Sequence, residues 1–314
     1  RWPRRRPARW TPSNSRCCRR CRPCGGPARS SLHIYPVKSC AGIDLAESIV
    51  DRAGLAHDRR WMVTTAAGQF MTQRQYPQMA RIRTALEDGM LVLRAPGMED
   101  LRIPADGSEL AERTQPVGVW RDTVIARAEH PRSAEWLSRF LGLPCRLLKI
   151  DLRADRTANP EWVDTWLERH PEWAEDFAGD HFFGFADGFP LLVANQSSLD
   201  ELNERLAARG QAPVPMNRFR ANIVVEGDWP AFEEDQTACI VAGGVRMAFV
   251  KPCTRCPMSN VDQVTAEVYD ELGLTLTTFR SLEIGVVFGQ NAIVDRTAPA
   301  PLRVGDAVEI ELDF

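Results

Sequence analysis

Short candidate strands, separated by turn-forming residues at roughly ten-residue spacing, run through the chain from residue 31 to residue 128. The strand candidates are LHIYPV, IDLAESIV, WMVTT and TVIARA. Dipeptides between them, among them Asp88-Gly89, Pro96-Gly97 and Asp106-Gly107, mark turns. Regularly spaced short strands are typical of sandwiches and barrels. We therefore predict a β-rich unit over 31–128.

The second half of the chain combines strand patterns with one clear helix pattern. The apolar run PLLVAN leads into Ser198-x-x-Glu201, which predicts a capping box at a helix N-terminus, and leucines then recur at helical spacing until Gly210. A Gly-Gly dipeptide joins CIVA to VRMAFV and predicts a β-hairpin. The last residues, VEIELDF, alternate apolar with acidic side chains, as a half-buried strand does.

Helical signals lie between these two regions. Residues 133–141 carry an apolar face that stops before Gly142, and Trp162 and Trp166 are one helical turn apart, which predicts a short helix or a lid. The expected fold class is mainly β with some α (α+β). The expected division is an extension over 1–30, a β-barrel-like domain over 31–128, a helical connector over 129–183 and a second β-barrel domain over 184–314.

The first 30 residues differ from the rest in composition. They hold ten arginines, five prolines and no acidic residue, together with Cys17, Cys18, Cys21 and Cys24. A zinc knuckle and a nucleic-acid-binding tail are alternatives for this composition. It lacks the compact apolar region of a secretory signal. We interpret it as a disordered extension, or as an upstream stretch outside the working protein.

The charge balance and the lack of long apolar runs argue against two classes of function, nucleic-acid binding and membrane spanning. The net charge is −3, so residues 31–314 together carry −13 once the ten arginines are set aside. An acidic globular part has no basic stripe for a nucleic-acid backbone. The sequence also lacks an apolar run of about 18 residues, so we expect no membrane span. The five remaining cysteines are odd in number and scattered, which predicts a reducing, cytoplasmic location.

Two of those cysteines, Cys253 and Cys256, form a C-x-x-C pair in KPCTRC. A structural zinc site needs four ligands, and no second Cys or His pair is evident. A redox dithiol normally follows a strand and opens a helix, whereas this pair follows a predicted hairpin. A third reading is a single thiolate that binds a soft metal, favoured by the nearby charges of Arg255 and Lys251. The motif alone leaves all three open.

Eight stretches, in order along the chain, resemble the MOSC superfamily in its two-part form, found in bacterial YcbX-like proteins and in the mitochondrial amidoxime-reducing component. The stretches are IYPVKSCAGI, GLAHDRRWMV, FADGFPLLVANQSSLDELNERL, MNRFRANIVVEG, KPCTRC, LTTFR, FGQNAIV and RVGDAVEIEL. The resemblance implies a MOSC N-terminal β-barrel domain over 31–128 and a MOSC domain core over 184–314.

The resemblance also implies a cofactor and its contacts. The family binds the molybdenum cofactor (Mo-molybdopterin), and the metal ligand falls on the second cysteine, Cys256, leaving Cys253 as a neighbour. The contacts carried over by motif are Lys38, Ser39, Arg59, Gly188, Phe189, Arg220, Asn222, Thr254, Arg255 and Asn291. Lysine, arginine and serine suit a phosphate, and asparagine suits the amide-like edge of a pterin.

The family chemistry implied is two-electron reduction of small N-hydroxylated or N-oxygenated compounds, with the cofactor carrying the reactivity and Cys256 as the catalytic ligand. The chain has no cysteine cluster for a fused iron–sulfur domain, so we expect a separate electron-donor protein that is ferredoxin-like, flavoprotein or cytochrome b5-like. The alternative is a non-enzymatic carrier of cofactor or sulfur that uses Cys256. The sequence departs from the family at Pro257 and at Gln263-Val264-Thr265, which bears on substrate choice and activity.

Overall fold

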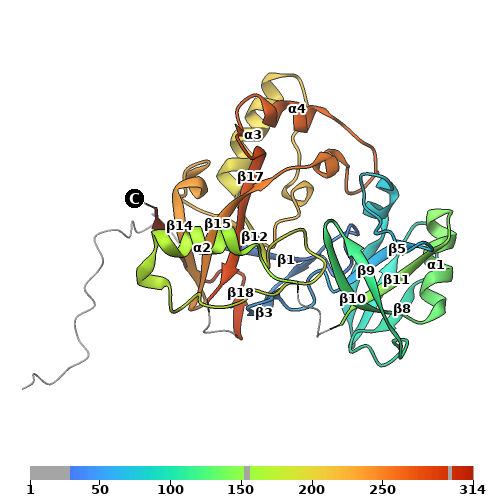
Figure 1. Cartoon of the computed structure of the whole chain (residues 1–314). Helices are drawn as coiled ribbons and strands as arrows, with labels where there is room; N and C mark the ends of the chain where they lie inside the picture. The colour runs from blue at the N-terminus through green and yellow to red at the C-terminus, as the bar shows by residue number, and fades with distance from the viewer. Residues whose placement is uncertain (1–28, 152–155, 296–298, 314) are drawn as a thin grey trace, which may run out of the picture.

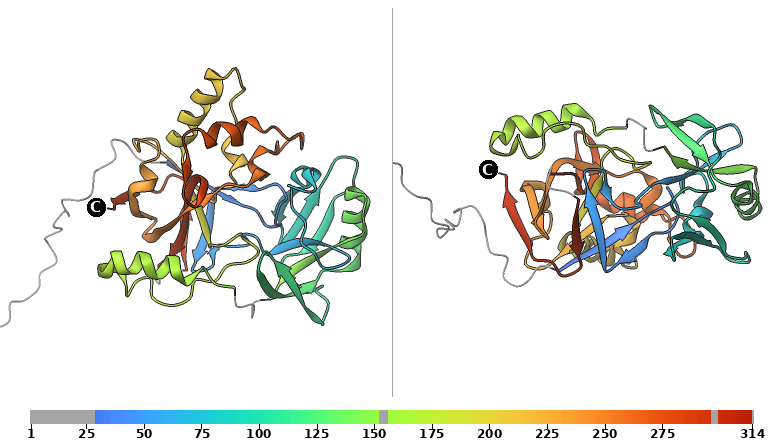
Figure 2. Two further views of the ribbon diagram at one scale, coloured as in Figure 1. Left: turned by 45° about the horizontal axis from the view of Figure 1, so that its top comes forward. Right: turned by 90° about the horizontal axis from the view of Figure 1, so that it is seen from below.

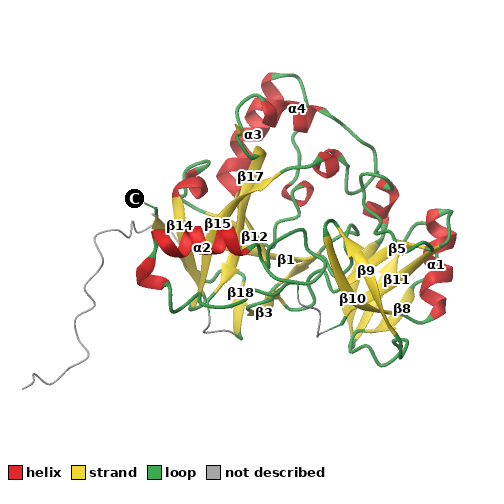
Figure 3. Ribbon diagram, in the orientation of Figure 1, coloured by secondary structure: helices red, strands yellow, loops and turns green. Residues whose placement is uncertain are grey.

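The computed structural model describes residues 29–151, 156–295 and 299–313. The four cysteines of the predicted extension lie outside the described residues. The first strand begins at Arg29, a few residues before the LHIYPV run that predicts it. The described chain is mainly β with a few helices, which confirms the predicted fold class (Figure 3).

A nine-stranded sheet built mostly from the second half of the chain holds the centre of the molecule (Figure 1). Its main path runs β19-β14-β15-β17-β12-β13-β1-β2, and β16 pairs with β17. Only β12 and β13 are parallel neighbours, since a helix connects them, as a parallel pair requires. The strands are β1 (Arg29–Ile34), β2 (Ile43–Leu45), β12 (Leu191–Asn195), β13 (Ile223–Glu226), β14 (Thr237–Ala242), β15 (Val245–Thr254), β16 (Ser281–Leu282), β17 (Gly285–Val294) and β19 (Val308–Leu312).

Three smaller sheets complete the β structure. One has the order β5-β11-β10-β9, another β6-β7-β8, and the third β18-β3-β4 joins a strand from near the C-terminus to two from near the N-terminus. The strands are β3 (Glu47–Asp51), β4 (Gly54–Leu55), β5 (Trp61–Thr65), β6 (Arg83–Glu87), β7 (Met90–Arg94), β8 (Leu101–Pro104), β9 (Thr114–Val119), β10 (Asp122–Ala128), β11 (Cys145–Ile150) and β18 (Ala300–Arg303). The first four strands of the chain therefore pair with each other or with strands of the second half, and the two halves are joined by backbone pairing (Figure 2).

The helices cover the outer faces of the sheets. They are α1 (Pro131–Leu141), α2 (Pro160–Arg169), α3 (Gln196–Ala208) and α4 (Glu271–Thr277), with 3-10 turns η1 (Pro77–Arg81), η2 (Pro171–Trp173), η3 (Met216–Arg218), η4 (Glu233–Gln236) and η5 (Pro257–Asn260). Gly142 ends α1 in the left-handed conformation, as its position predicts. Both helices predicted between the domains are present as α1 and α2. Among the described residues, no helix is long and apolar enough to cross a membrane.

The predicted capping box at Ser198 is wrong. Asn195, the last residue of β12, caps α3 instead: its side-chain oxygen accepts a hydrogen bond from the Ser197 N–H at 2.9 Å. Because the strand runs directly into the helix, the cap falls three residues earlier than the S-x-x-E pattern predicts. Ser198 is buried in the first turn, and its hydroxyl binds the Glu234 carboxylate at 2.7 and 2.8 Å.

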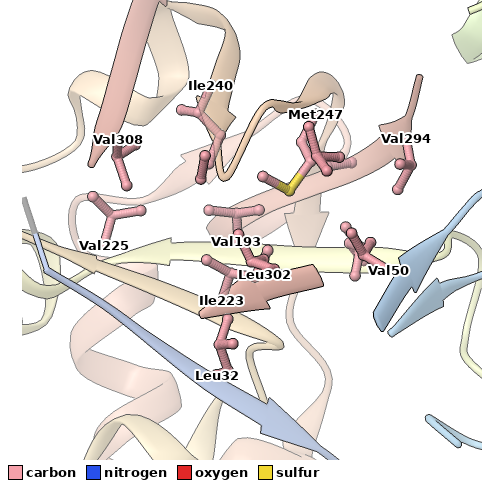
Figure 4. Packing of buried hydrophobic residues seen from close by; sticks show 14 of the residues in the cluster. Leu32, Val50, Val193, Ile223, Val225, Ile240, Met247, Val294, Leu302 and Val308 are labelled. Atoms are coloured by element: carbon pink, nitrogen blue, oxygen red, sulfur yellow. The ribbon is translucent and has the colours of Figure 1, made fainter. Parts of the chain in front are cut away.

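The largest apolar cluster lies inside the nine-stranded sheet and joins its two ends. Figure 4 shows Val193 and Ile223 from the parallel pair facing Met247 and Val294, with Val50 and Leu302 of the small β18-β3-β4 sheet beside them. These side chains are essentially fully buried. Each contributes about 1.5–3 kcal/mol relative to an exposed position, so this core holds in register the strands whose ends carry the site described below.

Candidate functional site

A cavity of about 210 Å³ lies where the loops after β1, before β12 and before β13 meet the ends of β15 and β17. All eleven residues proposed from the sequence line it: Lys38, Ser39, Arg59, Gly188, Phe189, Arg220, Asn222, Thr254, Arg255, Cys256 and Asn291. They come from six separate segments, so the fold brings together residues up to about 250 positions apart in sequence. The structure thus shows where these residues lie, and their roles toward a ligand stay a prediction.

Lys38 is a buried cation on the cavity wall. Its ammonium donates hydrogen bonds to the Phe185 carbonyl at 2.8 Å and to Asp187 Oδ1 at 2.5 Å. Burial lowers the pKa of Lys38, and the Asp187 carboxylate opposes that effect. For Asp187, desolvation acts to raise the pKa, but the Lys38 ammonium outweighs it and holds the pKa below the usual range. The two groups therefore form an ion pair on the cavity wall.

Two guanidinium groups stack on the ring of Tyr35. The central carbons of Arg59 and Arg220 lie 4.4 and 4.2 Å from the ring centroid. Burial raises the pKa of Tyr35 to about 12, so the phenol stays neutral between them. Burial, and then the charge of Arg59, lower the pKa of Arg220 to about 10, which still leaves it charged at neutral pH. Arg59 and Arg220 both have positive φ (46° and 58°), a strained conformation for non-glycine residues and one that is concentrated at functional sites.

Asn222 positions Arg59. The Asn222 side-chain oxygen accepts from Arg59 Nη1 at 2.9 Å and from the Leu192 N–H at 3.1 Å, while its amino group donates to the His33 carbonyl at 3.2 Å. A second partner, Asp58, accepts from Arg59 Nη1 at 2.5 Å. Because its oxygen accepts two hydrogen bonds from the protein, Asn222 supports Arg59, and one N–H of its amino group has no hydrogen-bond partner among the described residues and can serve a ligand.

The two cysteines of KPCTRC differ in their surroundings. Cys253 lies near the end of β15, and its Sγ accepts a hydrogen bond from Arg255 Nη1 at 3.0 Å. Cys256 lies just before η5 and is only partly buried. From the sequence we expect Arg255 to favour the thiolate of the metal-binding cysteine. In the structure, its guanidinium instead donates to Cys253. Pro257 occupies the first position of η5, where a missing N–H leaves no hydrogen bond unmade.

The cavity carries an excess of positive charge. One carboxylate lines it, Asp187, and two more, Asp58 and Asp262, pair with Arg59 and Arg218 behind its wall. Against these stand six lining cations: Lys38, Arg59, Arg218, Arg220, Lys251 and Arg255. Within the described residues, three positive charges therefore lack a matching carboxylate. In addition, the hydroxyl of Ser39 is buried and makes no hydrogen bond within the described residues. Surplus cations beside an unused donor favour an anionic ligand.

The departure from the family pattern at Gln263 has a structural consequence. The side-chain amides of Gln263 and Gln73 form a reciprocal pair at 3.0 and 3.1 Å, and Gln73 also donates to the Ser39 carbonyl at 2.9 Å. Asp262 holds the turn by accepting from the N–H groups of Val264 and Thr265. The altered loop thus supports the cavity residue Ser39 through one intermediate side chain.

Several residues that shape the site carry no signal in the sequence. Arg156, which is 3% exposed, donates to the carbonyls of Gly184 (3.1 Å), Ala186 and Asp187 (3.2 Å) and so fixes the loop that carries Gly188. Its Nε also donates to Asp122 at 2.7 Å. No local motif marks an arginine that binds carbonyls about 30 residues away in sequence, so only the tertiary structure identifies it.

The zinc reading gains no support from the geometry. Across residues 29–151, 156–295 and 299–313, no three His, Cys, Asp or Glu side chains gather as a metal site. Cys40, Cys145 and Cys239 are buried. Burial raises the pKa of Cys40 to about 12, which removes it as a thiolate candidate. The cavity is thus a positively charged site whose lining includes two cysteines, in a mainly β protein whose two halves share their sheets.

Comparison with known proteins identifies the family to which this chain belongs. The family model described as "MOSC N-terminal beta barrel domain" matches residues 28–144, and the one described as "MOSC domain" matches residues 180–309. The chain belongs to the MOSC family.

Its curated relatives include two kinds of protein. The mitochondrial amidoxime reducing component 2 of Bos taurus is 32% identical over 244 residues, covering 76% of this chain and 68% of that protein, and its Rattus norvegicus counterpart is 30% identical over 293 residues, covering 89% and 82%. The molybdenum cofactor sulfurase of Homo sapiens is 29% identical over 293 residues. That match covers 89% of this chain, which spans only about a third (32%) of the sulfurase.

Proposed function

We propose that this protein is a molybdenum-cofactor-binding oxidoreductase that reduces N-hydroxylated or N-oxygenated compounds, with Cys256 as the metal ligand. The observation that carries the proposal is one cavity that combines surplus positive charge, an unused buried donor and a partly buried cysteine. Relatives named for amidoxime reduction match most of the chain and support the choice of reaction class.

The residues present fit the cofactor. Arg220 supplies positive charge for its phosphate, beside Arg59 and Lys38, which are paired with Asp58 and Asp187, and the Ser39 hydroxyl supplies a donor. A Cβ atom built on Gly188 would meet no atom within 4 Å, so the cavity is open in front of that backbone, where a ligand can approach it closely. At the other end, Cys256 offers a thiolate to a soft metal.

When bound, the cofactor supplies the two-electron chemistry. Overall, the N–O bond of the substrate breaks, two electrons and two protons are consumed, and the oxygen leaves as water. The protein's own residues bind and orient: Arg59 and Arg220 are fixed by Tyr35 and Asn222, and they hold charge without rearranging when a ligand arrives. The ion pair of Lys38 with Asp187 keeps a carboxylate acceptor in the cavity at neutral pH.

The electrons are proposed to come from a separate protein, ferredoxin-like, flavoprotein or cytochrome b5-like. The net charge of −13 over residues 31–314 favours a partner with a basic docking face. Cys40, Cys145, Cys253 and Cys256 form no disulfide within the described residues, which supports a reducing compartment, for which we propose the cytoplasm.

The second candidate is a carrier of cofactor or sulfur that uses Cys256, and the similarity to the sulfurases favours it. Turnover separates the two. Purified protein loaded with cofactor is given benzamidoxime and a chemically reduced viologen, and benzamidine is quantified. We expect benzamidine to form with wild type and to be lost with Cys256→Ala. A loaded wild-type protein that forms none would favour the carrier.

A further inference from the structure

The hairpin turn between β9 and β10 holds an exposed tryptophan in a conformation that tryptophan rarely adopts. Val119 pairs with Asp122, so Trp120 and Arg121 form a two-residue turn. Trp120 has φ 58°, where glycine or asparagine is usual, and its side chain is 44% exposed. A strained backbone that leaves much of a large ring in water contributes little to stability. Such outliers point to function.

The indole of Trp120 stands against the cavity wall. Its N–H donates to Asp187 Oδ1 at 3.0 Å, the same oxygen that accepts from Lys38. The rings of Phe70 and Trp120 pack edge to face, with their centroids 5.1 Å apart. Because both donors use Oδ1, the second oxygen of Asp187 has no hydrogen bond from the described residues. The Asp187 side chain is 60% exposed. An acceptor is therefore available beside an exposed aromatic ring.

The arrangement is rigid. Asp122, at the end of the turn, accepts from Arg156 Nε at 2.7 Å, and the same guanidinium holds the Gly184 and Asp187 carbonyls. One buried arginine therefore fixes both the turn that carries Trp120 and the loop that carries Asp187. Binding a ligand between them would need no reordering of either segment.

A guanidinium group already stacks on the Trp120 ring, and its shape indicates the kind of ligand that would bind there. The guanidinium of Arg74, an exposed side chain, lies 4.5 Å from the centroid of the Trp120 ring. Guanidinium is flat, conjugated and rich in N–H groups. N-hydroxylated amidines and guanidines share all three properties, and an exposed arginine can be displaced from the ring by a ligand that also satisfies Asp187.

We propose that Trp120 and Asp187 form a substrate subsite for N-hydroxylated amidines and guanidines whose conjugated plane extends into an aryl ring. The conjugated face lies on the indole, and an amino group donates to Oδ2 of Asp187. This subsite rests on the proposed function and deepens it, because it selects aromatic over small aliphatic members of the substrate class.

Binding without turnover tests the subsite. Titration calorimetry without reductant measures the affinity of the full-length protein for benzamidoxime and for acetamidoxime, in wild type, Trp120→Ala and Ile125→Ala. Ile125 is an exposed apolar residue of the same hairpin (38% exposed) and serves as the control. We expect Trp120→Ala to weaken benzamidoxime binding about fivefold to tenfold and to change acetamidoxime binding less than about twofold. Ile125→Ala should change neither.

A third variant, Trp120→Gly, separates function from folding. Glycine relieves the backbone strain, so this variant should unfold at a temperature no lower than Trp120→Ala while binding benzamidoxime as weakly. The subsite is contradicted if wild type does not bind benzamidoxime, if both ligands weaken equally, or if the variants lose molybdenum. A wild type with neither molybdenum nor turnover contradicts the proposed function instead. Normal turnover of wild type, together with a Trp120→Ala substitution that changes the affinities for both ligands equally, contradicts the subsite alone.

Discussion

Replacing Arg156 with lysine should destabilise the protein more than its conservative character suggests. The guanidinium is buried and spreads its donors over the carbonyls of Gly184, Ala186 and Asp187 and over Asp122. A single ammonium cannot reach all four acceptors, because it lacks the planar fork of arginine.

The magnitude follows from which acceptors lose a partner. The Asp122 side chain is 49% exposed and can turn to water, so its ion pair contributes less than about 1 kcal/mol. The Gly184 residue is buried and its carbonyl has no such alternative, whereas Ala186 beside it is only partly buried; an unsatisfied buried acceptor costs about 1–3 kcal/mol. We expect Arg156→Lys to lower the free energy of unfolding by about 2–4 kcal/mol, a large part of the 5–15 kcal/mol typical of a domain.

Urea unfolding followed by tryptophan fluorescence measures this loss. Arg146 on β11 is exposed, and Arg146→Lys is the matched control, expected within about 0.5 kcal/mol of wild type. If Arg156→Lys also stayed within about 0.5 kcal/mol, the carbonyl clamp would not be holding the loop, and our account of the Asp187 wall would fail with it.

Three further predictions concern a buried acid, two glycines and a buried hydroxyl. Burial raises the pKa of Glu234 to about 7, so its contribution to stability is complete below its unfolded value of about 4.5 and is lost as the pH rises through 7; urea midpoints between pH 5 and 8 should fall for wild type and stay flat for Glu234→Gln, and parallel curves would contradict this. A Cβ on Gly184 would lie 2.5 Å from the Arg59 carbonyl oxygen, whereas one on Gly188 meets nothing. Gly184→Ala should therefore cost about 1–3 kcal/mol in urea unfolding, and Gly188→Ala should leave stability intact but reduce molybdenum content; equal unfolding midpoints for the two would refute it. Ser39→Ala removes a hydroxyl that has no hydrogen-bond partner among the described residues, so stability should change by less than about 0.5 kcal/mol, while cofactor retention on dialysis falls; unchanged retention would remove Ser39 from the site.

The sequence identifies local elements well when their signals are local. Gly142 ends α1 and the Gly-Gly turn joins β14 to β15, because turn chemistry needs only neighbouring residues. The predicted capping box is wrong because S-x-x-E is a common pattern that does not by itself fix a helix start. The end of β12 at Asn195 decides where α3 begins. Strand pairing between the two halves of the chain is set by long-range burial and has no local signal.

For the site, the family motifs locate the lining residues but not their partners. Cys256 and Arg220 line the cavity as expected, yet the contact of Arg255 with Cys253 depends on a side-chain direction that spacing does not fix. Trp120 and Arg156 act through contacts with a loop far along the chain, so no pattern of neighbouring residues marks them. Their roles follow from geometry and burial alone.

The molybdenum content of three proteins tests the central claim most directly. Wild type, Cys256→Ala and Cys253→Ala are made in a host that synthesises the cofactor, and metal is measured per chain. The account predicts about one molybdenum per chain in wild type, nearly the same in Cys253→Ala, and a loss in Cys256→Ala. Equal loss from the two cysteine variants would contradict a single thiolate ligand at Cys256, and zinc in place of molybdenum would contradict the cofactor itself.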